Sequence, residues 1–122
     1  MKIASMQVPV PNSLLFIRDP ATLERPRIEG SPHTWSTPSC VAVSCMPDCD
    51  GDTVITIGSA LEIGRADSPL VDRRLTTPSG AVIVEIVPGK EILRAHSEQS
   101  STRVRIWTDG RRDTSTVLIG LG

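Results

Sequence analysis

The sequence is poor in aromatic side chains: its 122 residues include two tryptophans, one phenylalanine and no tyrosine. A site for single-stranded nucleic acid normally places two or more aromatic rings beside a basic groove, and a large ligand pocket normally has aromatic walls. The net charge of −1 at pH 7 also provides no long-range attraction to nucleic acid or anionic lipid. These shortages weigh against nucleic-acid binding, carbohydrate binding and a large small-molecule pocket.

Long apolar segments are missing too. No apolar run approaches the roughly 18 residues that a membrane span needs, and no stretch repeats apolar positions with the period of a long amphipathic helix. No glycine-rich phosphate loop with its lysine is present. We expect neither a membrane partner nor a cofactor.

The choice of residues near the N-terminus and the cysteine count bear on the compartment. Residues 1–11 contain prolines and polar side chains in place of the apolar core of a signal peptide, and three cysteines cannot all pair within the chain. Both features favour a reducing cytoplasm. Eleven arginines against two lysines are typical of a GC-rich bacterial genome.

What the sequence does contain is short apolar runs with two-residue alternation, separated by Gly, Pro, Asp and Ser. This pattern predicts an all-β fold: a two-sheet antiparallel β-sandwich of seven or eight short strands, with a long Pro-rich connection, in a single domain spanning residues 1–122. The expected strands are residues 6–10, 14–17, 40–45, 53–57, 81–87, 90–95, 102–107 and 116–121, with a further extended segment near 70–75.

Some strands can be placed more closely. Residues 6–10 should form an edge strand, because Pro9 and Pro11 cannot donate a ladder hydrogen bond, and residues 81–87 are apolar enough to be central. Alternation also predicts two hairpin registers. The expected pairs are Ile106–Val117 and Val104–Ile119 across a loop at residues 109–114, and Val43–Ile55 and Val41–Ile57 across a loop at residues 46–52. A third turn at Pro88-Gly89 should exceed two residues, since Pro-Gly suits a type II turn, which twists hairpin strands poorly.

Residues 19–39 form the long connection, which holds four prolines and few apolar residues. Asp19 can cap a turn that begins at Pro20. Connections of about twenty residues are uncommon in compact domains and are often functional or mobile. We expect irregular coil lying across a sheet edge, with a binding role as the alternative.

The most informative group of side chains is an arginine and tryptophan stripe near the C-terminus. Arg103, Arg105 and Trp107 share one parity of a strand, and the other parity is aliphatic. If the aliphatic side chains point into the core, the stripe points to solvent. Arg111 and Arg112 follow in the next loop, and exposed Trp flanked by Arg is typical of interaction hot spots.

A second group is the acidic loop that carries Asp48, Asp50 and Asp52. These carboxylates are candidate ligands for a hard cation. Three short carboxylates rarely complete a calcium shell, and the Asp-Gly step in the loop suits a turn. We therefore expect a solvated loop and no bound metal.

The cysteines form a third group. Cys40 and Cys45 differ by an odd number of positions and should face opposite sides of a strand, which opposes a four-ligand zinc site. Cys49 lies between two aspartates whose charges oppose formation of a thiolate. Catalysis by Cys49 with His33 or His96 is therefore not expected.

Together these features predict a small non-catalytic binding protein, such as an inhibitor or immunity-like adaptor. Its partner would be a protein with an acidic or phosphate-bearing surface, recognised through Arg103, Arg105, Trp107, Arg111 and Arg112. One alternative is a small-ligand-binding or Cys/His-dependent enzyme domain with a pocket near His33, Trp35 and Cys49. Another is a structural homo-oligomer that pairs an exposed edge strand.

Overall fold

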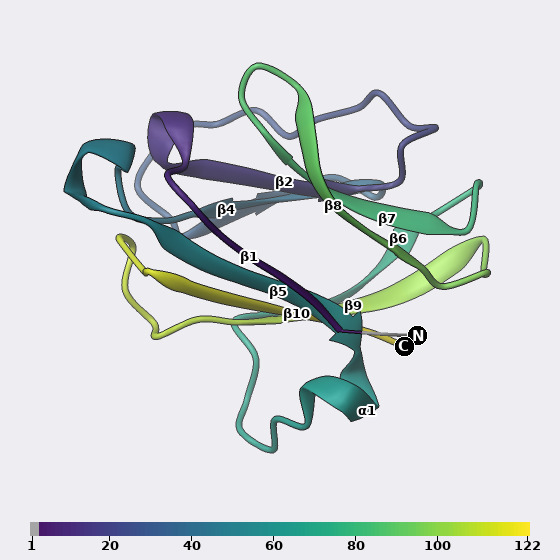
Figure 1. Ribbon diagram of the computed structural model, residues 1–122. Coiled ribbons are helices and arrows are strands. Elements are labelled where there is room, and N and C mark those ends of the chain that lie inside the picture. The colour runs from purple at the N-terminus through teal and green to yellow at the C-terminus, as the bar shows by residue number, and fades with distance from the viewer. Residues whose placement is uncertain (1–2) are drawn as a thin grey trace.

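The computed structural model describes residues 3–122 and shows two stacked β-sheets (Figure 1). The first sheet contains, in spatial order, β1 (Ala4–Val8), β5 (Thr53–Ser59), β10 (Thr116–Leu121), β9 (Ser101–Trp107) and β6 (Val71–Thr76). The second contains β3 (Thr34–Ser36), β4 (Cys40–Ser44), β2 (Leu14–Arg18), β7 (Ala81–Ile86) and β8 (Lys90–His96). The short helices are η1 (Pro11–Ser13), η2 (Asp48–Asp50) and α1 (Ala60–Ile63).

This architecture confirms the predicted all-β sandwich, although residues 3–122 form ten strands rather than seven or eight. The strand that the sequence did not predict is β3, inside the Pro-rich connection. Neighbouring strands run antiparallel except β5 and β10, which run parallel. None of the helices in this part of the chain has the length and apolar character to cross a membrane.

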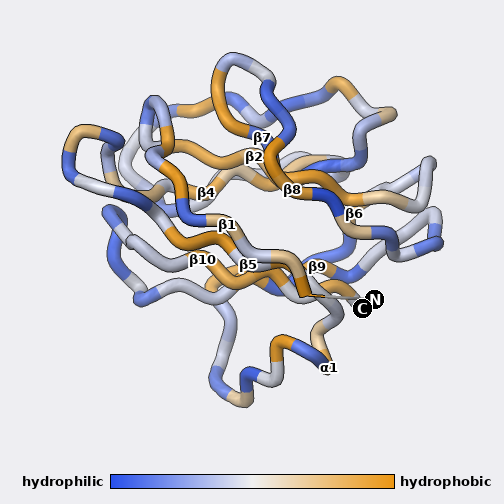
Figure 2. Tube along the Cα trace, in the orientation of Figure 1, coloured by the Kyte–Doolittle hydropathy of each residue, from blue (hydrophilic) through white to orange (hydrophobic). Residues whose placement is uncertain are grey.

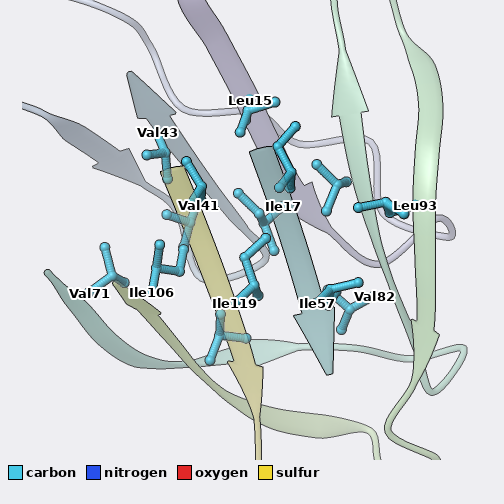
Figure 3. Packing of buried hydrophobic residues seen from close by; sticks show 14 of the residues in the cluster. Leu15, Ile17, Val41, Val43, Ile57, Val71, Val82, Leu93, Ile106 and Ile119 are labelled. Carbon is cyan, nitrogen blue, oxygen red and sulfur yellow. The ribbon is translucent and has the colours of Figure 1, made fainter. Parts of the chain in front are cut away.

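The core lies between the sheets. Figure 2 shows the apolar (orange) stretches along the strands of both sheets. In Figure 3, Ile17 and Val41 of the second sheet approach Ile106 and Ile119 of the first, and all four side chains are fully buried. Because side chains alternate along a strand, every second residue enters this layer.

The predictions of an edge strand near the N-terminus and of an interior strand at residues 81–87 are confirmed, although the edge strand covers residues 4–8 rather than 6–10. β1 forms an edge of the first sheet, beside β5, and β7 lies between β2 and β8. The β7–β8 turn spans three residues, with Gly89 N–H donating to the Ile86 carbonyl. It is longer than two residues, as the Pro-Gly step predicted.

The predicted hairpin of β4 and β5 is wrong. The two strands lie in different sheets, so residues 45–52 cross from one sheet to the other. All five residues of β4 are buried, which requires neighbours on both sides and cover on both faces. Alternation alone could not separate the two arrangements, because Val43 and Ile55 reach the core either as sheet neighbours or from facing sheets.

The predicted register of β9 and β10 is displaced by two residues. Ile106 pairs with Ile119, and Val104 pairs with Leu121. The loop is longer than predicted because buried Thr114 accepts from the Asp109 N–H and donates to the Thr116 carbonyl. An even displacement keeps each side chain on its predicted face.

The predicted exposure of Trp107 is also wrong. Its parity is as expected, since Val104 and Ile106 are buried on the opposite face, yet Trp107 is only 3% exposed. Residues 60–70 fold across the outer face of the sheet, where the indole N–H donates to the Asp67 carbonyl at 2.8 Å. Gly120 makes room for the ring on the neighbouring strand.

The edge strands differ in charge. β8 carries Lys90, Glu91 and Arg94, and β6 carries Arg73 and Arg74. Charged side chains on an edge oppose pairing with another chain. β1 and β3, the other two edge strands, have no charged residue, so association through an edge strand stays a prediction for these two strands.

Gly120→Ala should destabilise the protein, because a Cβ there would lie 3.0 Å from the Trp107 ring and 3.1 Å from the Ala60 Cα. Overpacking of this kind costs about 1–3 kcal/mol, measurable by urea denaturation. In a Trp107→Leu background the same change should cost less, since the closest contact is gone. An equal cost in both backgrounds would contradict this packing.

Candidate functional site

The predicted arginine and tryptophan stripe is divided in the structure. Arg103 and Arg105 lie on the outer face of the first sheet, together with Arg74 of β6; we call this the open face. The Arg103 guanidinium donates to the Asp72 carboxylate at 2.9 and 2.7 Å, and these hydrogen bonds lower the pKa of Asp72 below its ordinary value. Trp107, buried under residues 60–70, contributes nothing to this surface.

Arg111 and Arg112 lie in the loop before β10, at the end of that strand opposite to the end beside Arg103. β10 begins at Thr116, directly after this loop. It ends at Leu121, which pairs with Val104, the neighbour of Arg103 in β9. The loop before β10 is thus far from the open face. Its Arg112 guanidinium lies 5.9 Å from the centre of the Trp35 ring, within the range of a cation–π contact. An Arg/Trp pair therefore exists, but with Trp35 in place of Trp107.

Three loops meet at this end of the sandwich, on the left of Figure 1: residues 9–13, 45–52 and 108–115, which we call the loop end. Backbone hydrogen bonds join them, from Cys45 N–H to the Ser13 carbonyl at 3.0 Å and from Met46 N–H to the Thr114 carbonyl at 2.9 Å. Ser44 Oγ donates to the Arg112 carbonyl. The loops are thus held in a single arrangement by contacts between segments distant in sequence.

A cleft of about 480 Å³ opens at the loop end. Its apolar wall is made mainly by Leu14, Ile28, Trp35 and Pro47, and its lining also includes Asn12, Ser13, Ser44, Cys45, Arg112 and Asp113. Sequence reasoning placed a pocket near Trp35 but did not find Ile28 or Leu14 as its walls. The available signal was the tryptophan within a Pro-rich connection.

The backbone beside the cleft is strained. Asn12 and Ser13 have φ values of 59° and 55°, in the left-handed region that asparagine enters more readily than serine and that residues other than glycine occupy less often. Consecutive residues of this kind persist only where the surrounding structure holds them, and they gather at functional sites. This strain supports the cleft as the candidate site.

The connection at residues 19–39 positions Trp35. Glu85 of β7 is 2% exposed on the outer face of the second sheet, where it accepts from Arg18 at 2.6 Å and from Arg25 at 2.8 Å. Burial raises the pKa of Glu85, but the hydrogen bonds from Arg18 and Arg25 outweigh it, so the net pKa is lowered. Arg25 also lies over the Phe16 ring.

Further hydrogen bonds hold the connection at residues 19–39 in place. Buried Asp19 accepts from the Ala21 N–H and caps a turn, as predicted, and it also accepts from Ser79. The Trp35 indole N–H donates to the Glu29 carbonyl at 2.8 Å. The connection therefore lies as coil over the sheet, adds β3 at its edge, and sets the orientation of the Trp35 ring.

The acidic loop does not gather its carboxylates. Among residues 3–122, no three His, Cys, Asp or Glu side chains come together as a metal site requires. Asp48, Asp50 and Asp52 are therefore not placed as ligands of one cation.

Two of the three cysteines are buried, on opposite faces of β4. Cys45 lies in the main core and Cys40 on the other face of β4, as their spacing predicted. Burial raises the pKa of Cys40 to about 12 and that of Cys45 to about 11, so both thiols stay protonated. The lining of the cleft includes Trp35 but neither Cys49 nor His33, so this cleft does not bring together the three residues of the alternative Cys/His pocket.

The fold resembles that of a known inhibitor. The crystal structure of ComJ from Bacillus subtilis, an inhibitor of the DNA degrading activity of NucA, superposes with a TM-score of 0.63. The match covers 99% of this chain and 98% of ComJ, at 8% sequence identity. A likeness at this identity shows a shared fold. No family model matches the sequence, and no curated protein matches it.

Replacing Glu85 tests how the connection is held. Glu85→Gln leaves Arg18 without its buried counter-charge, which should cost about 3–5 kcal/mol at pH 7. A lowered folded-state pKa means that this stabilisation is complete above the ordinary Glu pKa of about 4.3 and is lost as pH falls through the lower folded value. Urea unfolding between neutral and strongly acidic pH should therefore show the two proteins converging in stability at acidic pH.

The matched control is Glu91→Gln, which removes a half-exposed pair with Arg94 on β8. Exposed pairs contribute about 1 kcal/mol or less, so this variant should stay close to wild type at every pH. A stability difference between Glu85→Gln and wild type that does not change with pH would contradict the proposed role of the Glu85 charge.

Proposed function

We propose that the protein is a non-catalytic inhibitor that binds a partner enzyme through the cleft at the loop end. Two findings support this. The chain shares its fold over nearly its whole length with ComJ, an inhibitor protein. The loop end also presents the kind of rigid, concave surface, with Trp and Arg at its edge, on which interfaces concentrate their binding energy.

The observation that carries the proposal is the Arg112 guanidinium, which lies 5.9 Å from the centre of the Trp35 ring where both residues line the cleft. Both residue types are enriched among interface hot spots. In the free protein, the Trp35 ring is held by the hydrogen bond from its indole N–H to the Glu29 carbonyl. The three loops of the loop end are joined by backbone hydrogen bonds. A surface ordered before binding loses little conformational entropy on association.

The non-catalytic assignment has its own support. Two of the three thiols have pKa values raised to about 12 and 11 by burial, so they are poor nucleophiles at neutral pH. Buried Glu85 is committed to two arginines. These two thiols and this carboxylate thus serve the structure of the protein.

The proposal is tested by capturing the partner from extracts of the source organism with the tagged protein. After the partner is identified, its catalytic activity is assayed with and without added protein. We expect a stoichiometric complex and loss of activity. Trp35→Ala and Arg112→Ala should each weaken binding by at least about 30-fold, the effect of a hot-spot truncation of about 2 kcal/mol.

Arg74→Ala on the open face is the matched control and should bind like wild type. Arg112 is exposed, so its variant should fold even if Trp35→Ala is destabilised. A complex in which the partner keeps its full activity would contradict the inhibitor assignment. Unchanged affinity of a folded Arg112→Ala variant, combined with loss of binding in Arg103→Ala, would show that the open face is the docking surface.

A further inference from the structure

The loop end carries an excess of negative charge. Residues 45–52 and 108–115 contain five aspartates and two arginines, a net charge of −3, whereas the whole chain has −1. The aspartates are all exposed: Asp48, Asp50, Asp52, Asp109 and Asp113. The rest of the molecule is therefore net positive, and the negative charge is concentrated at one end.

Three of these carboxylates, those of Asp48, Asp50 and Asp113, lie beside the cleft. η2, which carries Asp48 and Asp50, packs against η1, whose Asn12 and Ser13 line the cleft. Pro47, another lining residue, directly precedes Asp48. Asp113 lines the cleft from the other loop. The cleft thus has an apolar wall, a rim that carries Asp48, Asp50 and Asp113, and one arginine, Arg112, in its lining.

Within residues 3–122, one of these five aspartates, Asp113, takes part in an ion pair. Arg111 pairs with Asp113 at 3.3 Å, and Arg112 lies over Trp35. Asp48, Asp50 and Asp52 form no ion pair in this part of the chain, so their charges face solvent. Loops of this kind attract a cationic surface and repel an anionic one.

We infer that the cleft accepts an arginine or lysine side chain from a basic surface of the partner protein. This inference rests on the proposed function and gives the chemistry of the partner. The long aliphatic stem of such a side chain packs on Leu14 and Ile28, beside the Trp35 ring over which Arg112 lies, as arginine and lysine stems do on apolar surfaces. Its cationic head then lies near the carboxylates of the rim.

The inferred partner chemistry differs from the prediction made from the arginine stripe. That prediction required an acidic or phosphate-bearing partner, because it placed five recognition residues on one basic face. Trp107 is buried and Arg111 is paired to Asp113, and the two loops beside the cleft together carry five aspartates against two arginines. Enzymes that bind nucleic acid present basic surfaces to the phosphates, and the acidic loop end is complementary in charge to such a surface.

The experiment uses capped tetrapeptides of alternating leucine and arginine, with alternating leucine and glutamate as the matched probe. Each peptide is titrated into the ¹⁵N-labelled protein at low salt, where surface charges are screened least. We expect the arginine peptide to shift the Trp35 indole N–H and the amides of residues 45–52 and 108–113. Its binding should be about tenfold tighter than that of the glutamate peptide.

Charge variants separate the two surfaces. Asp48→Asn, Asp50→Asn and Asp52→Asn combined should abolish that preference, and Arg103→Ala with Arg105→Ala should keep it. All three aspartates are exposed, so the triple variant should fold. Equal or tighter binding of the glutamate peptide, or arginine-peptide shifts confined to the open face, would overturn the inference.

The peptide titration does not need the natural partner. If the arginine peptide binds at the cleft but the captured partner is not inhibited, the site for a cationic side chain is confirmed and the proposed function is wrong. If the partner is inhibited but the peptide preference is absent, the proposed function stands and the partner chemistry is wrong.

Discussion

The buried carboxylate of Glu85 constrains the arrangement of the rest of the molecule. A charge at 2% exposure is tolerated only if cations and hydrogen bonds replace the lost water. Arg18 supplies one cation from the adjacent strand, and Arg25 supplies the other from the Pro-rich connection. The connection must therefore lie across the outer face of the second sheet, where it also covers Phe16 and leads into β3.

The two sheets consequently have different outer faces. The second is covered by the connection, which brings Trp35 to the loop end beside Arg112. The first is open over Arg74 and Arg103 and is covered by residues 60–70 only around Trp107. The cleft forms where the covering connection ends and the three loops meet, so its shape follows from packing that stabilises the fold.

Sequence patterns predicted the faces of strands well and their neighbours less well. Alternation placed Val104 and Ile106 inward, because burial on one face has a period of two residues. It could not assign β4 and β5 to different sheets, since facing and adjacent strands bury the same side chains. Nor could it show that residues 60–70 cover Trp107, or that Arg112 reaches Trp35. Those contacts join segments far apart in sequence, and no local pattern encodes them.

The central claim is that the loop end is the docking surface. Hydrogen exchange of the protein alone and in complex with its captured partner tests this most directly, because it reports on every segment at once. The account predicts added protection at residues 11–14, 45–52 and 108–113, with little change in β6 and in the first half of β9. Protection confined to β6 and β9, with the three loops exchanging as in the free protein, would contradict it.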